Sequence, residues 1–300
     1  MKFGAVSNPS EIDFSLPPDH TGTGALLANL KNVGKPEVYV GCAKWNKKDL
    51  KNFYPRGTKD ELAYYSGQFN SIELNATFYR LFPKEQFTAW REKVPENFRF
   101  FPKITSFISH RKRLLDNRPL IDEYLDHASL LKDKLGTIFL QMHDNFKPKD
   151  FDRVKDFLGN WPKEIPLAVE FRHTDWFNEP NIAEELYALL EERGIANIIV
   201  DTAGRRDIMH MRLTTPEAFI RYVGANHPSD FDRLDIWAER IATWAEQGIK
   251  QVDFFIHQNE ERESTLLSAH FIKKLNARLG LDLHVPHSAG ASANDLKLDL

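Results

Sequence analysis

The chain has 300 residues, of which 42% are hydrophobic and 28% are charged, a composition typical of a globular protein with one large core. Its 40 basic and 43 acidic residues give a net charge of −3, so no general affinity for nucleic acid is indicated. No apolar run approaches the ~20 residues of a membrane span, and the single cysteine, Cys42, excludes an intrachain disulfide and a cysteine-rich metal site.

The first 36 residues are expected to form an arm outside the main domain. They show no sustained hydrophobic period and contain Pro17, Pro18, Gly22, Gly24 and Gly34. The opening residues also lack the basic region and long apolar core of a secretory signal, which favours a cytoplasmic location.

Eight short apolar runs after this arm predict the strands of a parallel sheet. They alternate with segments of helical pattern, and such alternation is typical of strands joined by crossover helices. In chain order the runs are 38–42, 71–75, 98–104, 137–142, 167–171, 197–201, 218–223 and 252–257. We therefore predict an α/β fold, a single-domain TIM-like (β/α)8 barrel over residues 37–284.

The connecting segments carry recognisable helix boundaries. Thr58 and Glu61 fit a capping box, and Gly194, Gly248 and Gly280 can end three helices. Residues 202–217 are too short and mixed for a full helix, so the sixth helix is expected to be short or irregular. Residues 285–300, which include HSAGASAND, are expected to form a flexible tail.

The predicted strands end in polar or charged residues, which strands buried on both faces would not normally carry. In a parallel barrel the C-terminal strand ends converge on one cleft, where such groups can bond to each other or to a ligand. Side chains two residues apart share one side of a strand, so neighbouring polar residues should point together. The polar residues are Glu73, Asn75, Lys103, Gln141, Glu170, Arg172, Asp201, Arg221, His257 and Asn259, and we interpret Cys42 as a small buried residue.

Burying charges costs several kcal/mol each before they pair, which favours a functional site over an ion-pair network that only seals the barrel. The catalytic candidates are Glu73, Lys103, His110, Glu170 and Asp201. His110 belongs to a basic run, residues 110–113, which together with Arg172 would attract a phosphate or carboxylate. Two aromatic residues after strand ends are candidate pocket walls, so the predicted ligand contacts are Trp45, Asn75, Tyr79, Gln141, Arg172, Arg221, His257 and Asn259.

Several motifs in order along the chain resemble the YecE-like family, a domain of unknown function. They include VGCAKW, ELAYYSGQFNSIELNATFY, FRFFPK, SHRKRL and LAVEFRHTDWF. The resemblance implies a TIM-like barrel with its pocket at the C-terminal strand ends, and it implies no reaction. Where many relatives carry Arg-x-His-Gly on the seventh strand, this chain has Arg221 followed by Tyr222, Val223 and Gly224, so His257 is the alternative source of an imidazole.

The first of three function classes is an enzyme without metal or cofactor, of the hydrolase, lyase or isomerase type. It would act on a small anionic ligand that is phosphorylated or sugar-like. Glu73 or Glu170 would serve as general acid or base, Lys103 and Arg221 would stabilise an oxyanion or phosphate, and His110 would carry a proton.

Two alternatives remain open from the sequence. One is a divalent-metal enzyme that resembles xylose isomerase or endonuclease IV, with ligands from Glu73, Glu170, Asp201 and His257. The cations Lys103 and Arg172 would compete with such a metal. The other, least favoured, is a non-catalytic nucleic-acid binding module that uses the basic rim and the aromatic residues. The oligomeric state is not indicated.

Overall fold

The computed structural model describes residues 3–31 and 34–287, and its strands form two sheets in which every paired strand runs parallel. The first sheet has the order β3 (Arg99–Pro102), β2 (Ser71–Leu74), β1 (Glu37–Cys42), β9 (Gln251–Gln258), β8 (Glu217–Gly224) and β7 (Ile199–Thr202). The second has the order β4 (Ile138–Gln141), β5 (Leu167–Glu170) and β6 (Ala196–Asn197). The predicted α/β class and all eight strand positions are confirmed.

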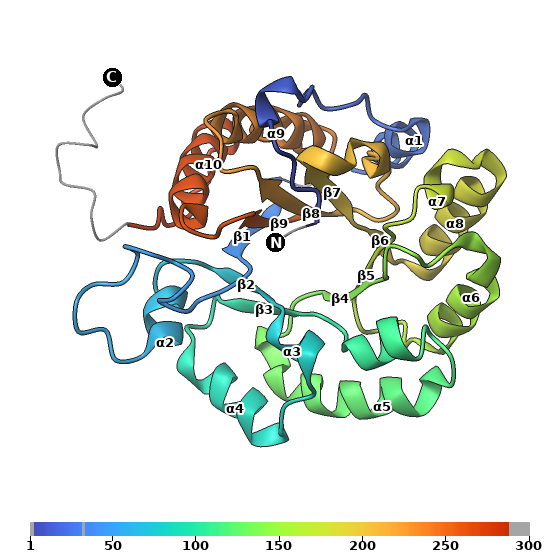
Figure 1. Cartoon of the computed structure of the whole chain (residues 1–300), viewed down its shortest axis with the longest axis horizontal. Coiled ribbons are helices and arrows are strands. Elements are labelled where there is room, and N and C mark those ends of the chain that lie inside the picture. The colour runs from blue at the N-terminus through green and yellow to red at the C-terminus, as the bar shows by residue number, and fades with distance from the viewer. Residues whose placement is uncertain (1–2, 32–33, 288–300) are drawn as a thin grey trace.

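The two sheets meet at two places. Between β3 and β4, parallel bridges join Phe100 to Leu135 and Lys103 to Phe139. On the other side β6 and β7 are separated only by Ile198, and the sequence predicts them as one strand. β6 pairs with β5 while β7 pairs with β8, so this stretch of chain belongs to both sheets. Figure 1 shows the strands around a common centre with the helices outside them.

Helices fill most of the connections. They are α1 (Thr21–Ala28), α2 (Glu61–Ser66), α3 (Ala76–Tyr79), α4 (Lys84–Lys93), α5 (Asn117–Ala128), α6 (Phe151–Asn160), α7 (Asp175–Asn178), α8 (Pro180–Arg193), α9 (Ser229–Glu246) and α10 (Ser264–Leu279). Between β7 and β8 the described chain has only the 3₁₀ segment η5 (Ala203–Ile208), as expected from the mixed pattern of residues 202–217.

The structure confirms helix ends at two of the predicted glycines, but it does not confirm the predicted capping box. Gly194 and Gly280 end α8 and α10 in the left-handed region, with φ of 64° and 62°. The predicted box at Thr58 is wrong, because Asp60 immediately precedes α2 and its carboxylate accepts a hydrogen bond from the Ala63 amide at 3.0 Å. Thr58 instead donates its hydroxyl to the carbonyl of Pro55.

The N-terminal segment contains a helix that its two glycines concealed in the sequence. Thr23 of α1 donates its hydroxyl to the Met211 carbonyl at 2.8 Å and accepts from the Leu213 amide at 2.8 Å. Asp19 accepts from the Trp244 indole of α9 at 2.9 Å. These contacts hold the segment against the body. Of the predicted C-terminal tail, residues 288–300 lie outside the described residues.

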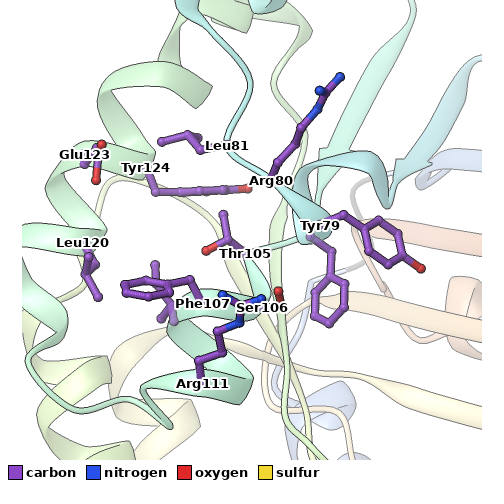
Figure 2. A pocket seen from close by; sticks show the side chains of 12 residues that line it. Tyr79, Arg80, Leu81, Thr105, Ser106, Phe107, Arg111, Leu120, Glu123 and Tyr124 are labelled. Atoms are coloured by element: carbon purple, nitrogen blue, oxygen red, sulfur yellow. The ribbon is translucent and has the colours of Figure 1, made fainter.

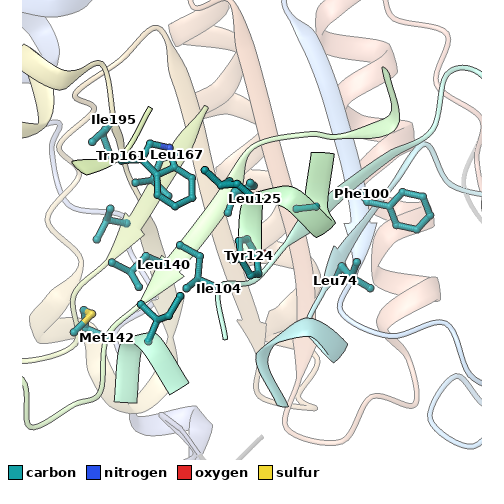
Figure 3. Close-up of a cluster of buried hydrophobic side chains, with 14 of the residues drawn as sticks. Leu74, Phe100, Ile104, Tyr124, Leu125, Leu140, Met142, Trp161, Leu167 and Ile195 are labelled. Carbon is teal, nitrogen blue, oxygen red and sulfur yellow. The ribbon is translucent and has the colours of Figure 1, made fainter. Parts of the chain in front are cut away.

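A shell of apolar side chains lies between the strands and the outer helices (Figure 3). It combines strand residues with residues of α5 and of the following connections, all of them nearly inaccessible to water. Burial of this size is the main favourable term in folding. The members drawn include Leu74, Phe100, Ile104, Tyr124, Leu125, Leu140, Met142, Trp161, Leu167 and Ile195. In the described residues no helix combines the length and apolar character needed to cross a membrane.

At the common centre of the strands, four phenylalanines form a layer. Phe101, Phe139, Phe219 and Phe255 come from β3, β4, β8 and β9, and their contacting rings have centroids 4.8 to 6.0 Å apart. Rings from four strands can contact one another only if they point to the same centre. Residues two positions further along each strand therefore point to the same side, above this phenylalanine layer.

A pair of carboxyl groups lies at the opposite end of the strands, where Glu217 begins β8. Burial and then the charge of Glu217 raise the pKa of Asp253 well above its usual value, and burial also raises the pKa of Glu217. Gln251 donates to both oxygens of Asp253, at 3.0 and 3.1 Å. The raised pKa values mean that the folded protein retains protons that the unfolded chain loses.

We expect Asp253→Asn to stabilise the protein at neutral and alkaline pH. Since the native state binds more protons than the unfolded state, wild-type stability should fall as the pH rises above about 4, the ordinary aspartate value. The asparagine keeps the shape and removes this loss. Urea unfolding at pH 5 and pH 8 should show a smaller decline for Asp253→Asn than for wild type or for the exposed control Asp282→Asn. Equal declines in all three proteins would contradict the expectation.

Candidate functional site

Arg221 of β8 is the centre of a charged network above the phenylalanine layer. Its side chain is fully buried, and it points inward because Phe219, two residues earlier, does so. The guanidinium donates from Nε to Oε2 and from Nη2 to Oε1 of Glu73, each at 2.8 Å. It also donates from Nη1 to Oε2 of Glu170 at 2.5 Å. The structure thus brings together two carboxylates from distant parts of the chain.

Glu170, the last residue of β5, is surrounded by donors. Besides the bond from Arg221, it accepts from Nε of Arg172 at 2.5 Å and from Nε2 of Gln141, at 3.0 Å to each oxygen. Although burial opposes the charge, Arg172 and Arg221 lower the pKa of Glu170 to about 2. An ionised carboxylate with occupied oxygens is a poor general acid or base, so this geometry favours an orienting role for Glu170.

Glu73 is equally well bonded, and it fixes the orientation of His257. Burial disfavours its charge, but Arg221 and His257 hold the pKa of Glu73 well below its usual value. It accepts from Nδ2 of Asn75 at 2.7 Å and faces Nε2 of His257 at 2.9 Å. Because an ionised carboxylate faces Nε2, we assign a hydrogen to that nitrogen. Nδ1 has no hydrogen-bond partner among the residues that the structure describes, and it lies 3.9 Å from Oε1 of Glu261.

Lys103 directly follows β3 and is almost completely buried. Its Nζ donates to Oε1 of Gln141 at 2.7 Å and lies 4.1 Å from the centre of the Phe78 ring. Burial, and then the charges of Arg221 and Arg172, lower the pKa of Lys103 to about 7. The side chain is therefore able to exchange a proton near neutral pH, unlike the two glutamates.

A cavity of about 530 Å³ opens above this network. Trp45 and Tyr79, the predicted pocket walls, both contribute to it, and Tyr79 is 79% exposed. Tyr54 fixes the first wall, because its hydroxyl donates to the carbonyl of Trp45. The lining residues are Ala43, Lys44, Trp45, Asn46, Asp49, Glu73, Leu74, Asn75, Ala76, Tyr79, Lys103, His257 and Glu261.

His110 reaches the network through an aromatic ring. It lies in the π-helical segment η2 (Phe107–Arg111), and its imidazole contacts the edge of Phe78 and the ring of His143, with centroids 4.9 and 5.1 Å apart. Burial, followed by the charges of His143 and Lys103, lowers the pKa of His110 to about 4. His110 is thus neutral at pH 7, on the side of Phe78 that adjoins the basic run.

Arg172 connects the network to a second hollow on the same rim. Its guanidinium carbon lies 3.8 Å from the ring centre of Phe3, so the N-terminal segment reaches the site. Arg205 donates to the backbone carbonyl of Arg172 at 2.8 Å. The hollow has a volume of about 450 Å³ and is lined by Asp144, Asn145, Lys147, Arg172, His173, Thr174, Arg205 and Asp207.

Asp201 does not join the network, contrary to the sequence-based expectation. Its neighbour Val200 belongs to the interior cluster with the phenylalanine layer, so Asp201 points outward to the helices. There it accepts from Nη2 of Arg233 at 2.8 Å and from the Trp237 indole at 2.7 Å, both on α9, and it also pairs with Arg206. The polar residue at this strand end does belong to a polar cluster, but that cluster lies on the outer face of the strand, away from the cavity.

Two other strand-end residues also lie apart from the cavity. Asn259 donates its backbone amide to the carbonyl of Gly224 at 3.1 Å and does not line the cavity. Cys42 is fully buried, and burial raises the pKa of its thiol to about 12. This fits the packing role that the sequence predicts for Cys42, since a reactive thiol needs a lowered pKa.

The donors proposed for a divalent metal are not arranged to bind one. In the part of the chain that the structure describes, no three His, Cys, Asp or Glu side chains are grouped to hold a metal ion. Asp201 faces α9, and the guanidinium of Arg221 occupies the space between Glu73 and Glu170. The residues present therefore do not fit the metal site that the alternative interpretation requires.

Sequence reasoning does not identify Glu261 or Phe3, and it also omits the polar cavity residues Lys44, Asn46 and Asp49. Glu261 lines the cavity and hydrogen-bonds to the hydroxyl of Ser264 at 2.6 Å, and its position four residues after His257 is a weak signal. Phe3 lies far from every predicted strand, so only the folded N-terminal segment reveals its contact with Arg172. Neither side chain interrupts an apolar run, which was the signal used for the others.

A smaller hollow of about 220 Å³ lies beside the main cavity (Figure 2). Leu120, Glu123 and Tyr124 of α5 form one side of it, and Tyr79 lines both this hollow and the main cavity. None of Glu73, Glu170 and Arg221 lines it. The basic run contributes Arg111 here, so that run is divided between several surfaces.

Comparison with known proteins identifies relatives over most of the chain. Residues 39–289 match a family model described as protein of unknown function DUF72. The UPF0759 protein YecE of Escherichia coli K12 is 28% identical over 229 residues, which are 69% of this chain and 82% of YecE. The UPF0759 protein YunF of Bacillus subtilis 168 is 26% identical over 178 residues, 55% of this chain and 60% of YunF.

Solved structures show the same fold. A DUF72 family protein from Thermotoga maritima MSB8 is 24% identical, with a TM-score of 0.65 over 80% of this chain and 99% of that one. A DUF72 family protein from Enterococcus faecalis V583 is 20% identical, with a TM-score of 0.66 over 85% of this chain and all of that one. At these identities the likeness concerns the fold and not the chemistry.

Proposed function

The chain belongs to the DUF72 family, and from this premise we propose that it is a metal-independent enzyme that acts on a small anionic ligand. The reaction is of the hydrolase, lyase or isomerase type, and the ligand carries a phosphate or carboxylate. It binds in the cavity of about 530 Å³ at the C-terminal ends of the strands.

The proposed scaffold is a closed (β/α)8 barrel formed by residues 37–284, with residues 1–36 as an arm against it. The bridges between β3 and β4 and the stretch shared by β6 and β7 support closure at both places where the two sheets meet. Contact among the four inward phenylalanines is what a filled barrel interior requires.

One observation carries the functional proposal: Lys103 lines the cavity and forms no salt bridge among the described residues, while Arg172 lies on the same rim, paired with Glu170 and lining the adjoining hollow. Both glutamates already accept bonds from Arg221, and Glu170 also accepts from Arg172. An anion that enters the cavity would complete the charge balance. In a partly enclosed site such attraction is stronger than in bulk water.

The alternatives have less support. The four proposed metal ligands do not converge on one point, because Asp201 faces α9 and Arg221 separates Glu73 from Glu170. For a nucleic-acid binding module, the rim arginines would have to be available, but Arg113 pairs with Asp150, Arg205 with Asp207 and Arg206 with Asp201. A groove for a nucleic-acid backbone needs unpaired positive charge along its length.

Thermal unfolding with added anions tests the proposal. Phosphate, sulfate and small carboxylates should raise the melting temperature of wild type, because a ligand that binds only the folded state stabilises it. The increase should be reduced in Lys103→Met, which removes a cation that lines the cavity, and retained in Arg118→Gln, which removes an exposed arginine of α5. A chelator should leave the increase unchanged. An equal increase in Lys103→Met, or loss of the increase on chelation, would contradict the proposal.

The affinity for sulfate should fall as the pH rises through about 7. Lys103 has its pKa lowered to about 7, so above this pH it loses the positive charge that attracts the anion. Sulfate keeps a constant charge over this range, and titration calorimetry at pH 6 and pH 8 would isolate the protein group. In Lys103→Met the affinity should be lower at pH 6 and nearly independent of pH. A pH dependence that survives in Lys103→Met would assign it to another group.

A further inference from the structure

Lys103 is a buried lysine without a carboxylate partner. Among the salt bridges of residues 3–31 and 34–287, none involves this side chain, although two glutamates belong to the same network. Its Nζ bonds to the neutral Oε1 of Gln141 and lies over the Phe78 ring. Lys134, by contrast, is equally buried but has its Nζ 3.3 Å from Asp133.

This environment favours a neutral amine over an ammonium. Burial removes water from the charged form, and the guanidinium groups of Arg221 and Arg172 repel it, which together lower the pKa of Lys103 to about 7. A neutral lysine amine has a free electron pair and is a nucleophile, as in enzymes that form imines with carbonyl substrates. Lys103 also lines the open cavity, so a ligand can reach it.

We propose that Lys103 forms a covalent imine with the carbonyl carbon of a small anionic aldehyde or ketone that binds in this cavity. The inference rests on the proposed function, because the same cavity holds the ligand and the charge of Arg172 on the same rim attracts its anionic end. The Nζ electron pair forms the new C–N bond, and the C=O π electrons move to oxygen. That oxygen takes up both amine hydrogens and leaves as water, so the condensation needs no oxidant, reductant or further reagent.

Two neighbouring groups suit this chemistry. Within the described part of the chain the Nδ1 atom of His257 has no hydrogen-bond partner. This residue lines the same cavity, so it can carry protons between nitrogen and the departing oxygen. Below, Phe139 has its ring centre 5.9 Å from Nζ of Lys103 and belongs to the phenylalanine layer, which excludes water from that side. An imine in this position is protected from hydrolysis except through the cavity opening.

Reductive trapping tests the inference on the intact protein. Glyoxylate, a carboxylate with an aldehyde, and acetaldehyde, a neutral aldehyde, are each added at pH 7 with cyanoborohydride, and the modified lysines are mapped by mass spectrometry. An ordinary lysine is neutral to about one part in three thousand at pH 7. We therefore expect Lys103 to be labelled at least about tenfold faster than Lys134 and the exposed Lys155.

The pH dependence and the variants separate the possible outcomes. Labelling of Lys103 should be half-maximal near pH 7, whereas exposed lysines should react increasingly above pH 9. Lys103→Met should lose only this label. Arg172→Gln should slow both aldehydes at Lys103, because loss of the Arg172 charge raises the pKa of the amine, and it should slow glyoxylate more than acetaldehyde because it also removes attraction for the carboxylate.

If acetaldehyde labels Lys103 selectively and glyoxylate labels it no faster, the imine inference is supported and the proposal of an anionic ligand is rejected. If neither aldehyde labels Lys103 faster than Lys134, the imine inference is overturned. Sulfate binding tests the proposed function separately, because binding of sulfate does not require a nucleophile.

Discussion

Replacing Arg221 with methionine is expected to lower the free energy of unfolding by about 3 to 5 kcal/mol, the cost of breaking a buried ion pair by removing one partner. Arg221 is fully buried and donates three hydrogen bonds to Glu73 and Glu170. Methionine fills part of the volume but leaves both carboxylates without their shared counter-ion. The two glutamates would then repel each other in an environment with little water.

Urea unfolding at pH 7 measures this loss, and the matched control is Arg113→Met. Arg113 pairs with Asp150 across 3.6 Å at the rim, so its loss should cost no more than about 1 kcal/mol. The deficit of Arg221→Met should shrink at pH 4, because unpartnered buried carboxylates bind protons readily. The double variant Arg221→Met with Glu73→Gln should recover part of the stability. A deficit no greater than that of Arg113→Met would show that the network contributes little.

Replacing Asp201 with alanine is expected to lower the free energy of unfolding by about 2 to 4 kcal/mol without affecting ligand binding. The change removes the carboxylate that accepts from Arg233, Arg206 and the Trp237 indole, and it leaves Arg233 with Asp230 at 3.1 Å and the Val223 carbonyl at 3.4 Å. Because these contacts lie on the outer face of β7, the inward cavity should keep its geometry.

The test combines unfolding with the ligand assays. Asp201→Ala should show the lower stability together with unchanged sulfate affinity and unchanged trapping at Lys103. The control Asp207→Ala removes an exposed partner of Arg205 and should cost less than about 1 kcal/mol. If folded Asp201→Ala loses trapping at Lys103, Asp201 contributes to the site, and its assignment to the outer face is contradicted.

The strands and most of the polar network could be predicted because buried strands have a simple sequence pattern. Apolar runs of four to eight residues mark the strands, and a charge at a strand end requires a polar environment. Glu73, Lys103, Glu170 and Arg221 meet as this reasoning requires, and the resemblance to the YecE-like family is confirmed. Side chains two residues apart also share a face, so Asn75 and Arg172 follow from Glu73 and Glu170.

The failures have a common physical cause, because a polar strand end does not say which face the side chain takes. Asp201 ends an apolar run like the others, but the phase of β7 places Val200 inside and Asp201 outside. Partner choice is equally hidden in the sequence. The glutamates looked like general acids or bases until their contacts with Arg221 and Arg172 were known, and those same contacts leave Lys103 without a carboxylate.

The phenylalanine layer closes the inner end of the cavity. The centre beneath the polar network is filled by Phe101, Phe139, Phe219 and Phe255. A ligand and the water released in the proposed condensation would therefore both pass through the cavity opening at the rim. A bound molecule that occupies the cavity opening would slow the access of water to Lys103. For the imine proposed at Lys103, this arrangement predicts an ordered release, in which part of the bound molecule departs before water hydrolyses the imine.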